Sequence, residues 1–223
     1  MKYLLVTISL MMANTMNSQD KPTLIYVGDP MCSWCYGFGH EIEDAITELG
    51  EDVQLEMVMG GLRPYDTQTM TDLKDFLTDH WNDVHEASGQ PFQYSILDTE
   101  LIYDTEPSCR AVMIVRELQP STVMAYFHKV QTAFYAENKN PHLTNTYADI
   151  AVSMSIDRET FVNKFESKEY KTSIKNDFLR ASQLGVRSFP TVLLSVKGKT
   201  KVVSAGYSKA KKVIENIRKI IGD

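Results

Sequence analysis

Two kinds of hydrophobic pattern divide the chain into three parts. Short runs of apolar residues end at turn-forming residues, which is typical of strands. After the first run and after the last, apolar residues recur at three- and four-residue spacing, which predicts a helix up to about residue 49 and another from about residue 213. The predicted strands are 23–28, 53–59, 191–196 and 200–205. We therefore expect a βαβ unit near the start of the chain and a ββα unit at its end.

The middle of the chain has a different pattern. From residue 62 to residue 183 the apolar residues follow helical spacing in several successive groups, interrupted at glycine and proline. The sequence thus predicts an α/β fold in which residues 19–61 and 184–223 form one domain and residues 62–183 form a large all-helical insertion.

The first 18 residues have the features of a secretory signal peptide. Lys2 supplies a positive charge, residues 3–13 are mostly apolar, and small or polar residues follow. The alternative is a membrane anchor, but about 20 apolar residues are needed to span a bilayer. We expect cleavage near Gln19, export to the periplasm or outside the cell, and no membrane insertion of the mature protein.

Composition and charge narrow the choice of partners. The chain is 43% apolar and carries a formal net charge of −6. The apolar content is sufficient for a core, and the negative charge argues against nucleic acid as a ligand. We expect proteins or small molecules as partners, and a monomer, since the first strand begins only a few residues after the predicted cleavage point.

Cys32 and Cys35 lie at the junction between the first predicted strand and the first predicted helix, with Ser33 and Trp34 between them. A cysteine at a helix N-terminus meets unpaired backbone N–H groups and the positive end of the helix dipole, which favour the thiolate. Cys32 is therefore the predicted nucleophile. Cys35 lies one helical turn further on and is the predicted resolving thiol.

Other interpretations of this cysteine pair are half of a zinc site and a structural disulfide. The chain has one more cysteine, Cys109, and five histidines that show no ligand spacing. We therefore expect no metal site and no cofactor other than a redox-active Cys32–Cys35 disulfide. A Cu(I) or soft-metal carrier that uses Cys32 and Cys35, with or without Cys109, is an alternative, and one of the eleven methionines is adjacent to Cys32.

The segment from Asp29 to Phe38, together with the segment from Gly185 to Thr191, resembles the thioredoxin-fold family of DsbA-like proteins, and in particular its FrnE-like branch. The resemblance covers nearly the whole mature chain. It implies that Pro190 is a cis-proline whose loop faces the active-site disulfide and docks the substrate backbone, with Phe189 and Thr191 beside it. Family members also often carry a buried acid six residues before the nucleophile, where this chain has Tyr26.

Three further residues have two interpretations each. Trp34 either contacts protein substrates or covers the helix start. Asp29 is either an accessory acid or a turn former before Pro30. Cys109 follows a predicted helix start, so it is either a more thiolate-like accessory group or a buried small hydrophobe.

The predicted function is an exported thiol-disulfide oxidoreductase that exchanges disulfides with protein thiols and depends on an unidentified recycling partner. The alternatives are an enzyme similar to the kappa-type glutathione transferases and aromatic-ring isomerases, or the metal carrier. The transferase-like relatives usually have a serine at the position of Cys32 and lack the second cysteine.

Overall fold

The computed structural model describes residues 21–222 and contains one four-stranded sheet in that range. β1 (Thr23–Gly28) pairs in parallel with β2 (Gln54–Met59) and antiparallel with β3 (Thr191–Val196), which pairs antiparallel with β4 (Lys199–Ala205). The strand order is β2-β1-β3-β4. The first predicted strand is confirmed to the residue, and the second and fourth differ from the structure by one residue at their starts.

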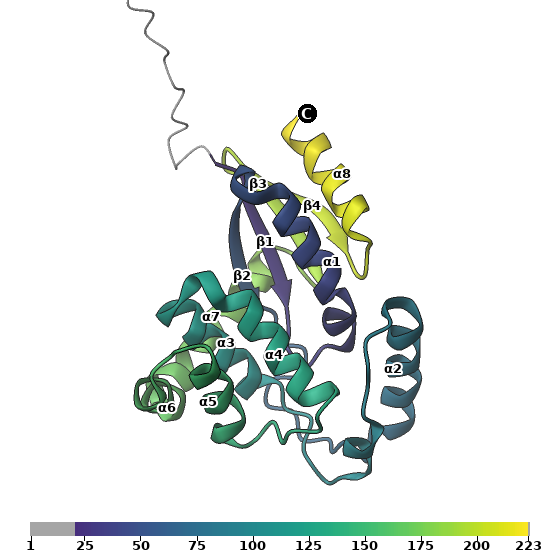
Figure 1. Cartoon of the computed structure of the whole chain (residues 1–223), viewed down its shortest axis with the longest axis vertical. Helices are drawn as coiled ribbons and strands as arrows, with labels where there is room; N and C mark the ends of the chain where they lie inside the picture. The colour runs from purple at the N-terminus through teal and green to yellow at the C-terminus, as the bar shows by residue number, and fades with distance from the viewer. Residues whose placement is uncertain (1–20, 223) are drawn as a thin grey trace, which may run out of the picture.

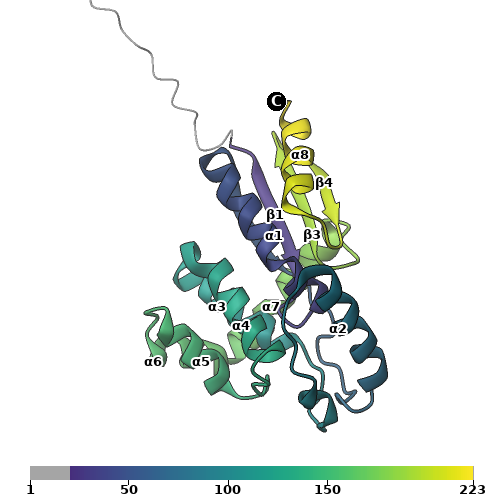
Figure 2. The same cartoon turned by 45° about the vertical axis from the view of Figure 1, so that its right-hand side comes forward.

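Helices cover both faces of this sheet (Figures 1 and 2). α1 (Ser33–Leu49) and α8 (Ala210–Ile221) pack against each other on one face, and α7 (Lys168–Gln183) covers the other. β1 is buried on both faces because it lies inside the sheet. Leu24 and Tyr26 belong to the cluster below α1, whereas Ile25 and Val27 belong to the cluster below α7.

The predicted insertion contains α2 (Lys74–Ser88), α3 (Glu106–Leu118), α4 (Val123–Tyr135), α5 (Thr144–Ser153), α6 (Arg158–Glu166) and α7. It also contains two irregular segments before α2 and before α3, which are joined by a short antiparallel bridge between Thr69 and Ile102. The thioredoxin-like fold with a helical insertion is thus confirmed, although the insertion is not helical throughout.

The insertion is divided between two apolar clusters. α3 to α6 share the main core with α1 and the sheet, whereas α2 packs with the irregular segments in a second cluster around the buried Trp81. Met31 and Tyr36, which flank the cysteine pair, belong to this second cluster. The start of α1 is therefore held from two sides.

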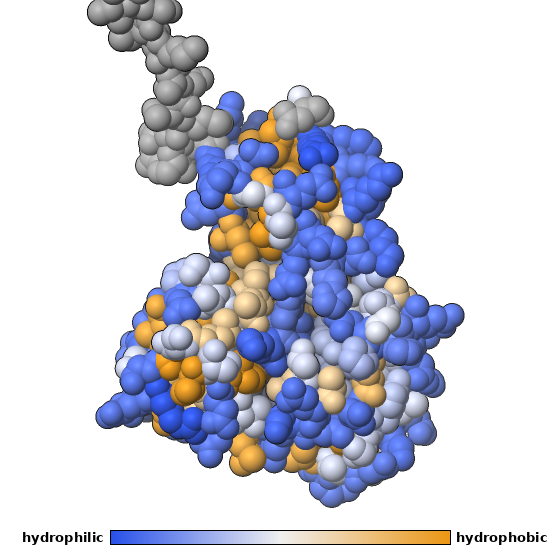
Figure 3. All heavy atoms as spheres, viewed as in Figure 1, coloured by the Kyte–Doolittle hydropathy of each residue, from blue (hydrophilic) through white to orange (hydrophobic). Residues whose placement is uncertain are grey.

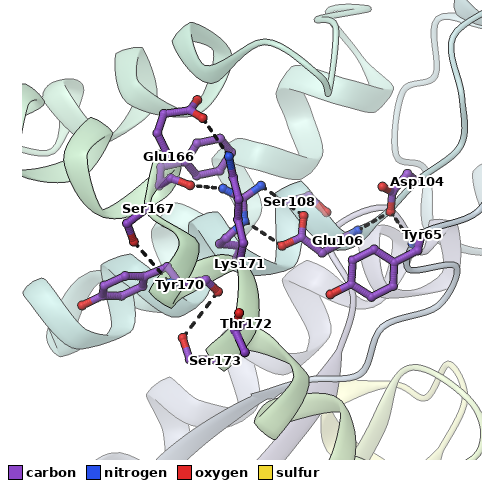
Figure 4. A network of polar contacts seen from close by, with 12 residues as sticks. Tyr65, Asp104, Glu106, Ser108, Glu166, Ser167, Tyr170, Lys171, Thr172 and Ser173 are labelled. Atoms are coloured by element: carbon purple, nitrogen blue, oxygen red, sulfur yellow. Dashed lines mark hydrogen bonds and ion pairs between the residues drawn. The ribbon is translucent and has the colours of Figure 1, made fainter.

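Charged pairs fix α3 against its neighbours. Arg116 forms a two-pronged ion pair with Asp177 of α7, and Asp177 also accepts a hydrogen bond from the backbone of Met59 at the end of β2. Near the start of α3, Arg110 pairs with Glu106 of the same helix at 2.6 Å and donates to the Phe165 carbonyl of α6. Glu106 lies in the polar network shown in Figure 4. These contacts tie α3 to α7, to the end of β2 and to α6.

The surface in the view of Figure 3 is largely hydrophilic, with apolar residues gathered where the sheet meets the helical part. Within the described range, no helix combines the length and the apolar character that crossing a bilayer requires. The predicted signal peptide, residues 1–18, lies outside the described residues.

Candidate active site

The cysteine pair lies where the chain passes from β1 into α1. Asp29 and Pro30 form a turn in which the backbone N–H of Met31 donates to Asp29 Oδ1 at 2.8 Å and that of Cys32 donates to the Asp29 carbonyl at 3.1 Å. Cys32 is the N-cap residue of α1, with an extended backbone. Its sulfur therefore lies at the positive end of the helix, as the sequence predicts.

The two sulfurs differ in exposure and in surroundings. Cys32 is 5% exposed and Cys35 is fully buried, one turn into α1. All three cysteines are free thiols in this structure. Burial raises the pKa of Cys35 well above its ordinary value, and a hydrogen bond with Cys32 adds to this shift. Cys35 therefore holds its proton in the reduced protein, and Cys32 is the sulfur that a substrate can reach.

The loop before β3 faces Cys32 at the edge of the sheet where β1 ends and β3 begins. The Phe189–Pro190 peptide bond is cis, as predicted. The carbonyl oxygen of Phe189 accepts a hydrogen bond from Cys32 Sγ at 3.6 Å, although 157 positions separate the two residues. Thr191 is buried, and its hydroxyl donates to the Ser188 carbonyl at 2.8 Å, which supports the loop from within.

Two glycines at the end of β2 complete the surroundings of this loop, and sequence reasoning did not identify them as part of the site. A Cβ at Gly60 would lie 2.2 Å from the Phe189 ring, and one at Gly61 would lie 2.7 Å from the Phe178 ring. The aromatic rings thus rest directly on the backbone. The Gly-Gly pair marks the end of a strand in the sequence, but nothing local indicates which side chain occupies the space above it.

Asp29 connects the site to α3. Its carboxylate is fully buried and accepts hydrogen bonds from the backbone N–H of Leu62 at 2.6 Å and from the Cys109 thiol at 3.3 Å. The turn-forming interpretation of Asp29 is confirmed. Its carboxylate also links the turn after β1 to the segment after β2 and to the first turn of α3. Burial is the largest influence on the carboxyl and raises its pKa above 3.8.

Of the two interpretations of Cys109, the structure agrees with the buried small residue. Cys109 lies in the first turn of α3, but it is fully buried, and burial together with the negative charge of Asp29 raises its pKa well above the ordinary value. Loss of solvation thus outweighs the field of the helix N-terminus. An accessory role in the redox reaction stays a prediction.

Trp34 lies partly buried at the start of α1, where its ring is 6.0 Å from that of Tyr207. This position agrees with the helix-covering interpretation. Contact with substrate stays a prediction, as it does for Phe189 and Thr191.

Within residues 21–222, no three His, Cys, Asp or Glu side chains come together in a way that could hold a metal ion. Cys32, Cys35 and Cys109 accordingly do not form a three-ligand group in this range, and the soft-metal alternative that uses the cysteine pair alone stays untested. Among the histidines, His128 pairs with Glu43 at 2.6 Å, and His142 contacts the Ile102 carbonyl at 2.7 Å.

A family model described as thioredoxin matches residues 25–204. The chain belongs to the thioredoxin family. Among solved structures it is similar to a candidate protein disulfide isomerase from Nitrosomonas europaea, with a TM-score of 0.82 and 29% identity over 91% of this chain and 98% of that one. The comparison with curated proteins gave no match.

Two further structures share the fold at lower identity. One is the cytosolic disulfide reductase DsbM from Pseudomonas aeruginosa, with a TM-score of 0.74 and 22% identity over 90% of this chain and 98% of that one; DsbM has also been solved with GSH. The other is the oxidoreductase DsbA from Xylella fastidiosa, with a TM-score of 0.59 and 11% identity over 91% and 86% of the two chains. The resemblance to DsbA-like proteins is thereby confirmed, and the names of these neighbours agree with the enzyme class predicted from the sequence. The FrnE-like branch stays a prediction.

Proposed function

We propose that this protein is an exported thiol-disulfide oxidoreductase that exchanges disulfides with protein substrates through Cys32 and Cys35. The observation that carries the proposal is the pairing of a slightly exposed sulfur at the start of α1 with the cis-Pro190 loop opposite it. The family match and the disulfide enzymes among the structural neighbours support the same chemistry.

In the oxidising direction, a substrate thiolate attacks Cys32 of the Cys32–Cys35 disulfide and Cys35 leaves as a thiolate. A second substrate thiolate then attacks the substrate sulfur of the mixed disulfide, forms the substrate disulfide, and releases Cys32 as a thiolate. In the reducing direction, Cys32 attacks a substrate disulfide and Cys35 resolves the mixed disulfide. The field of the α1 N-terminus favours the Cys32 thiolate in both directions.

The Pro190 loop would hold the substrate chain next to Cys32. Phe189 turns its carbonyl towards Cys32, so the backbone of this loop lies beside the sulfur. Pro190 has no N–H group, so the loop would offer its other backbone groups to an extended substrate segment. Main-chain recognition of this kind suits many different protein substrates.

Export and the recycling partner belong to the same proposal. The apolar N-terminal residues support export, and a disulfide formed outside the cytosol persists. Because a structure of DsbM has been solved with GSH, glutathione is one reductant to test against protein dithiols.

The test is reduction of insulin and refolding of scrambled ribonuclease by the purified protein. We expect Cys32→Ser to reduce both activities to background and Cys35→Ser to accumulate mixed disulfides. Cys109→Ser serves as the matched control, since Cys109 is fully buried and lies outside the cysteine pair; it should retain most of the activity. Full activity in Cys32→Ser would refute the proposal.

The transferase or isomerase alternative predicts a different result. Such an enzyme would process a small substrate in the presence of glutathione and would tolerate loss of Cys35. Retention of a glutathione-dependent activity in Cys35→Ser, with no insulin reduction by the wild type, would favour that alternative.

A further inference from the structure

A small cavity lies between α1, α4 and the turn that follows α2. Its volume is about 70 Å³, which is room for roughly two water molecules at about 30 Å³ each. The buried Gly39 and Gln131 line its inner side, whereas the exposed His40, Gln90 and Thr132 line its outer side. The cavity can therefore admit a small molecule or a single side chain from solvent.

Gln131 of α4 is the first sign that this cavity is a binding site. The residue is fully buried, yet neither its amide nitrogen nor its amide oxygen has a hydrogen-bond partner within residues 21–222. Buried polar side chains in proteins are nearly always paired, because an unpaired one loses its hydration without compensation. An apolar residue of the same length would avoid this cost. The amide at the cavity wall thus indicates an occupant that pairs with it.

His128 lies one turn earlier on α4 and provides a third unpaired atom. Its Nδ1 is 2.6 Å from Glu43 Oε1 of α1, and this hydrogen bond lowers the pKa of Glu43. The ionised carboxylate can only accept, so the proton lies on Nδ1, and Nε2 of the neutral ring carries a lone pair. Nε2 is buried and has no partner in the described part of the chain. A Cβ at Gly39 would lie 3.1 Å from this nitrogen, so the glycine leaves it accessible from the cavity.

The three unpaired atoms are one donor, Gln131 Nε2, and two acceptors, Gln131 Oε1 and His128 Nε2. A primary carboxamide has the opposite set, with one carbonyl oxygen and two N–H groups. We infer that the cavity is a binding site for a primary carboxamide group, whose carbonyl accepts from Gln131 and whose two N–H groups donate to Gln131 and His128.

Charged ligands fit the cavity less well. A carboxylate has no proton to donate to the two acceptors, and within residues 21–222 the lining includes no lysine or arginine to balance its charge. An ammonium group cannot accept from Gln131. Two water molecules are the competing occupants, and the experiment must separate them from a carboxamide.

The carboxamide has two sources, a free small amide or the asparagine or glutamine side chain of a bound protein. Tyr36, which follows Cys35 in α1, also lines the cavity, so an occupant would lie close to the redox pair along the chain. Binding itself uses neither cysteine. The inference therefore goes beyond the proposed function and does not depend on it.

The test is an NMR titration of the full protein with acetamide at slightly alkaline pH, where histidine is neutral. Two matched probes serve as controls: N,N-dimethylacetamide accepts a hydrogen bond but cannot donate one, and acetate is charged and only accepts. We expect acetamide to shift the side-chain amide signals of Gln131 saturably, and the two controls to leave them unchanged.

Variants locate the site, with binding followed at the backbone amide of Thr132. Gln131→Met keeps the length of the side chain and should weaken acetamide binding about tenfold or more, as the loss of two hydrogen bonds implies. Gln119→Met is the matched control, since the amide of Gln119 donates to the Met154 carbonyl at 3.4 Å instead, and it should bind like wild type. Gly39→Ala places a methyl group against His128 Nε2, should also weaken binding, and decides the matter if Gln131→Met does not fold.

A blocked asparagine, compared with a blocked alanine, distinguishes the two sources. Tighter binding of the asparagine than of acetamide would assign the site to a protein side chain, and binding of acetamide alone would assign it to a free amide. Absence of a saturable shift with acetamide and with the asparagine, or equal shifts with N,N-dimethylacetamide, would overturn the inference and leave water as the occupant. Wild-type affinity in both Gln131→Met and Gly39→Ala would overturn it as well.

Discussion

Gly60 should be intolerant of any side chain, because the Phe189 ring occupies the space where a Cβ would be. That Cβ would lie 2.2, 2.3 and 2.7 Å from three atoms of the ring. Non-bonded carbon atoms prefer separations of about 3.5–4.0 Å. In Gly60→Ala the ring must therefore move by roughly 1 Å or more, a distance that follows from the same preference.

The displacement acts on the site through the backbone of Phe189, whose carbonyl oxygen lies 3.6 Å from Cys32 Sγ. We expect Gly60→Ala to reduce the free energy of unfolding by about 1–3 kcal/mol, the usual range for overpacking. Insulin reduction should fall by about 10- to 100-fold, since a misplacement of about 1 Å can cost that much in rate. Urea unfolding and initial rates of insulin precipitation measure the two effects.

Two variants separate this mechanism from a general glycine effect. Phe189→Leu gives the new methyl group room, so the double variant should recover part of the stability lost in Gly60→Ala. Gly39→Ala adds a methyl group to the middle of α1, where it meets His128 at 3.1 Å, and should leave the exchange rate unchanged. Wild-type stability and rate in Gly60→Ala would refute the reasoning, and a double variant no better than the single one would show that Phe189 is not the group displaced.

Two further predictions concern thiol reactivity and pH. In reduced protein, brief alkylation at mildly acidic pH should label Cys32 first, because it is the one cysteine of the three with exposed surface. Cys35 and Cys109 should stay unmodified until denaturant is added. Peptide mass analysis checks this, and early labelling of Cys109 would contradict its burial. Burial raises the pKa of Asp29 in the folded protein above its unfolded value of about 3.8. The protonated carboxyl therefore stabilises the folded protein at low pH, and this stabilisation is lost as the pH rises from about 3.8 through the raised pKa. Wild type should thus lose stability relative to Asp29→Asn across that window in urea unfolding, and parallel pH profiles for the two proteins would contradict the shift.

The parts of the fold that could be predicted from the sequence depend on local patterns. The limits of β1 follow from an apolar run that stops at Asp29, and the place of Cys32 at the start of α1 follows from the change of period after it. The cis bond before Pro190 was predicted only because the cysteine motif and the proline motif occur together, since local chemistry favours trans.

The parts that could not be predicted depend on contacts between distant segments. Nothing near Gly60 indicates that Phe189 packs on it, and nothing near Cys109 indicates that Asp29 lies opposite, 80 positions earlier. For Cys109 the local signal even pointed the wrong way, because the position at a helix start is visible in the sequence whereas the loss of solvation is not.

The order of synthesis has a consequence for the redox pair that follows from the pairing of β1 with β3. The ribosome completes Cys32 and Cys35 early, but the chain that pairs with β1 and carries Phe189 comes 157 positions later. At about 5–20 residues per second, this interval lasts roughly 10–30 s. Throughout it the dithiol has neither the opposing loop nor the completed sheet. The long insertion therefore delays assembly of the site until nearly the whole chain has been synthesised.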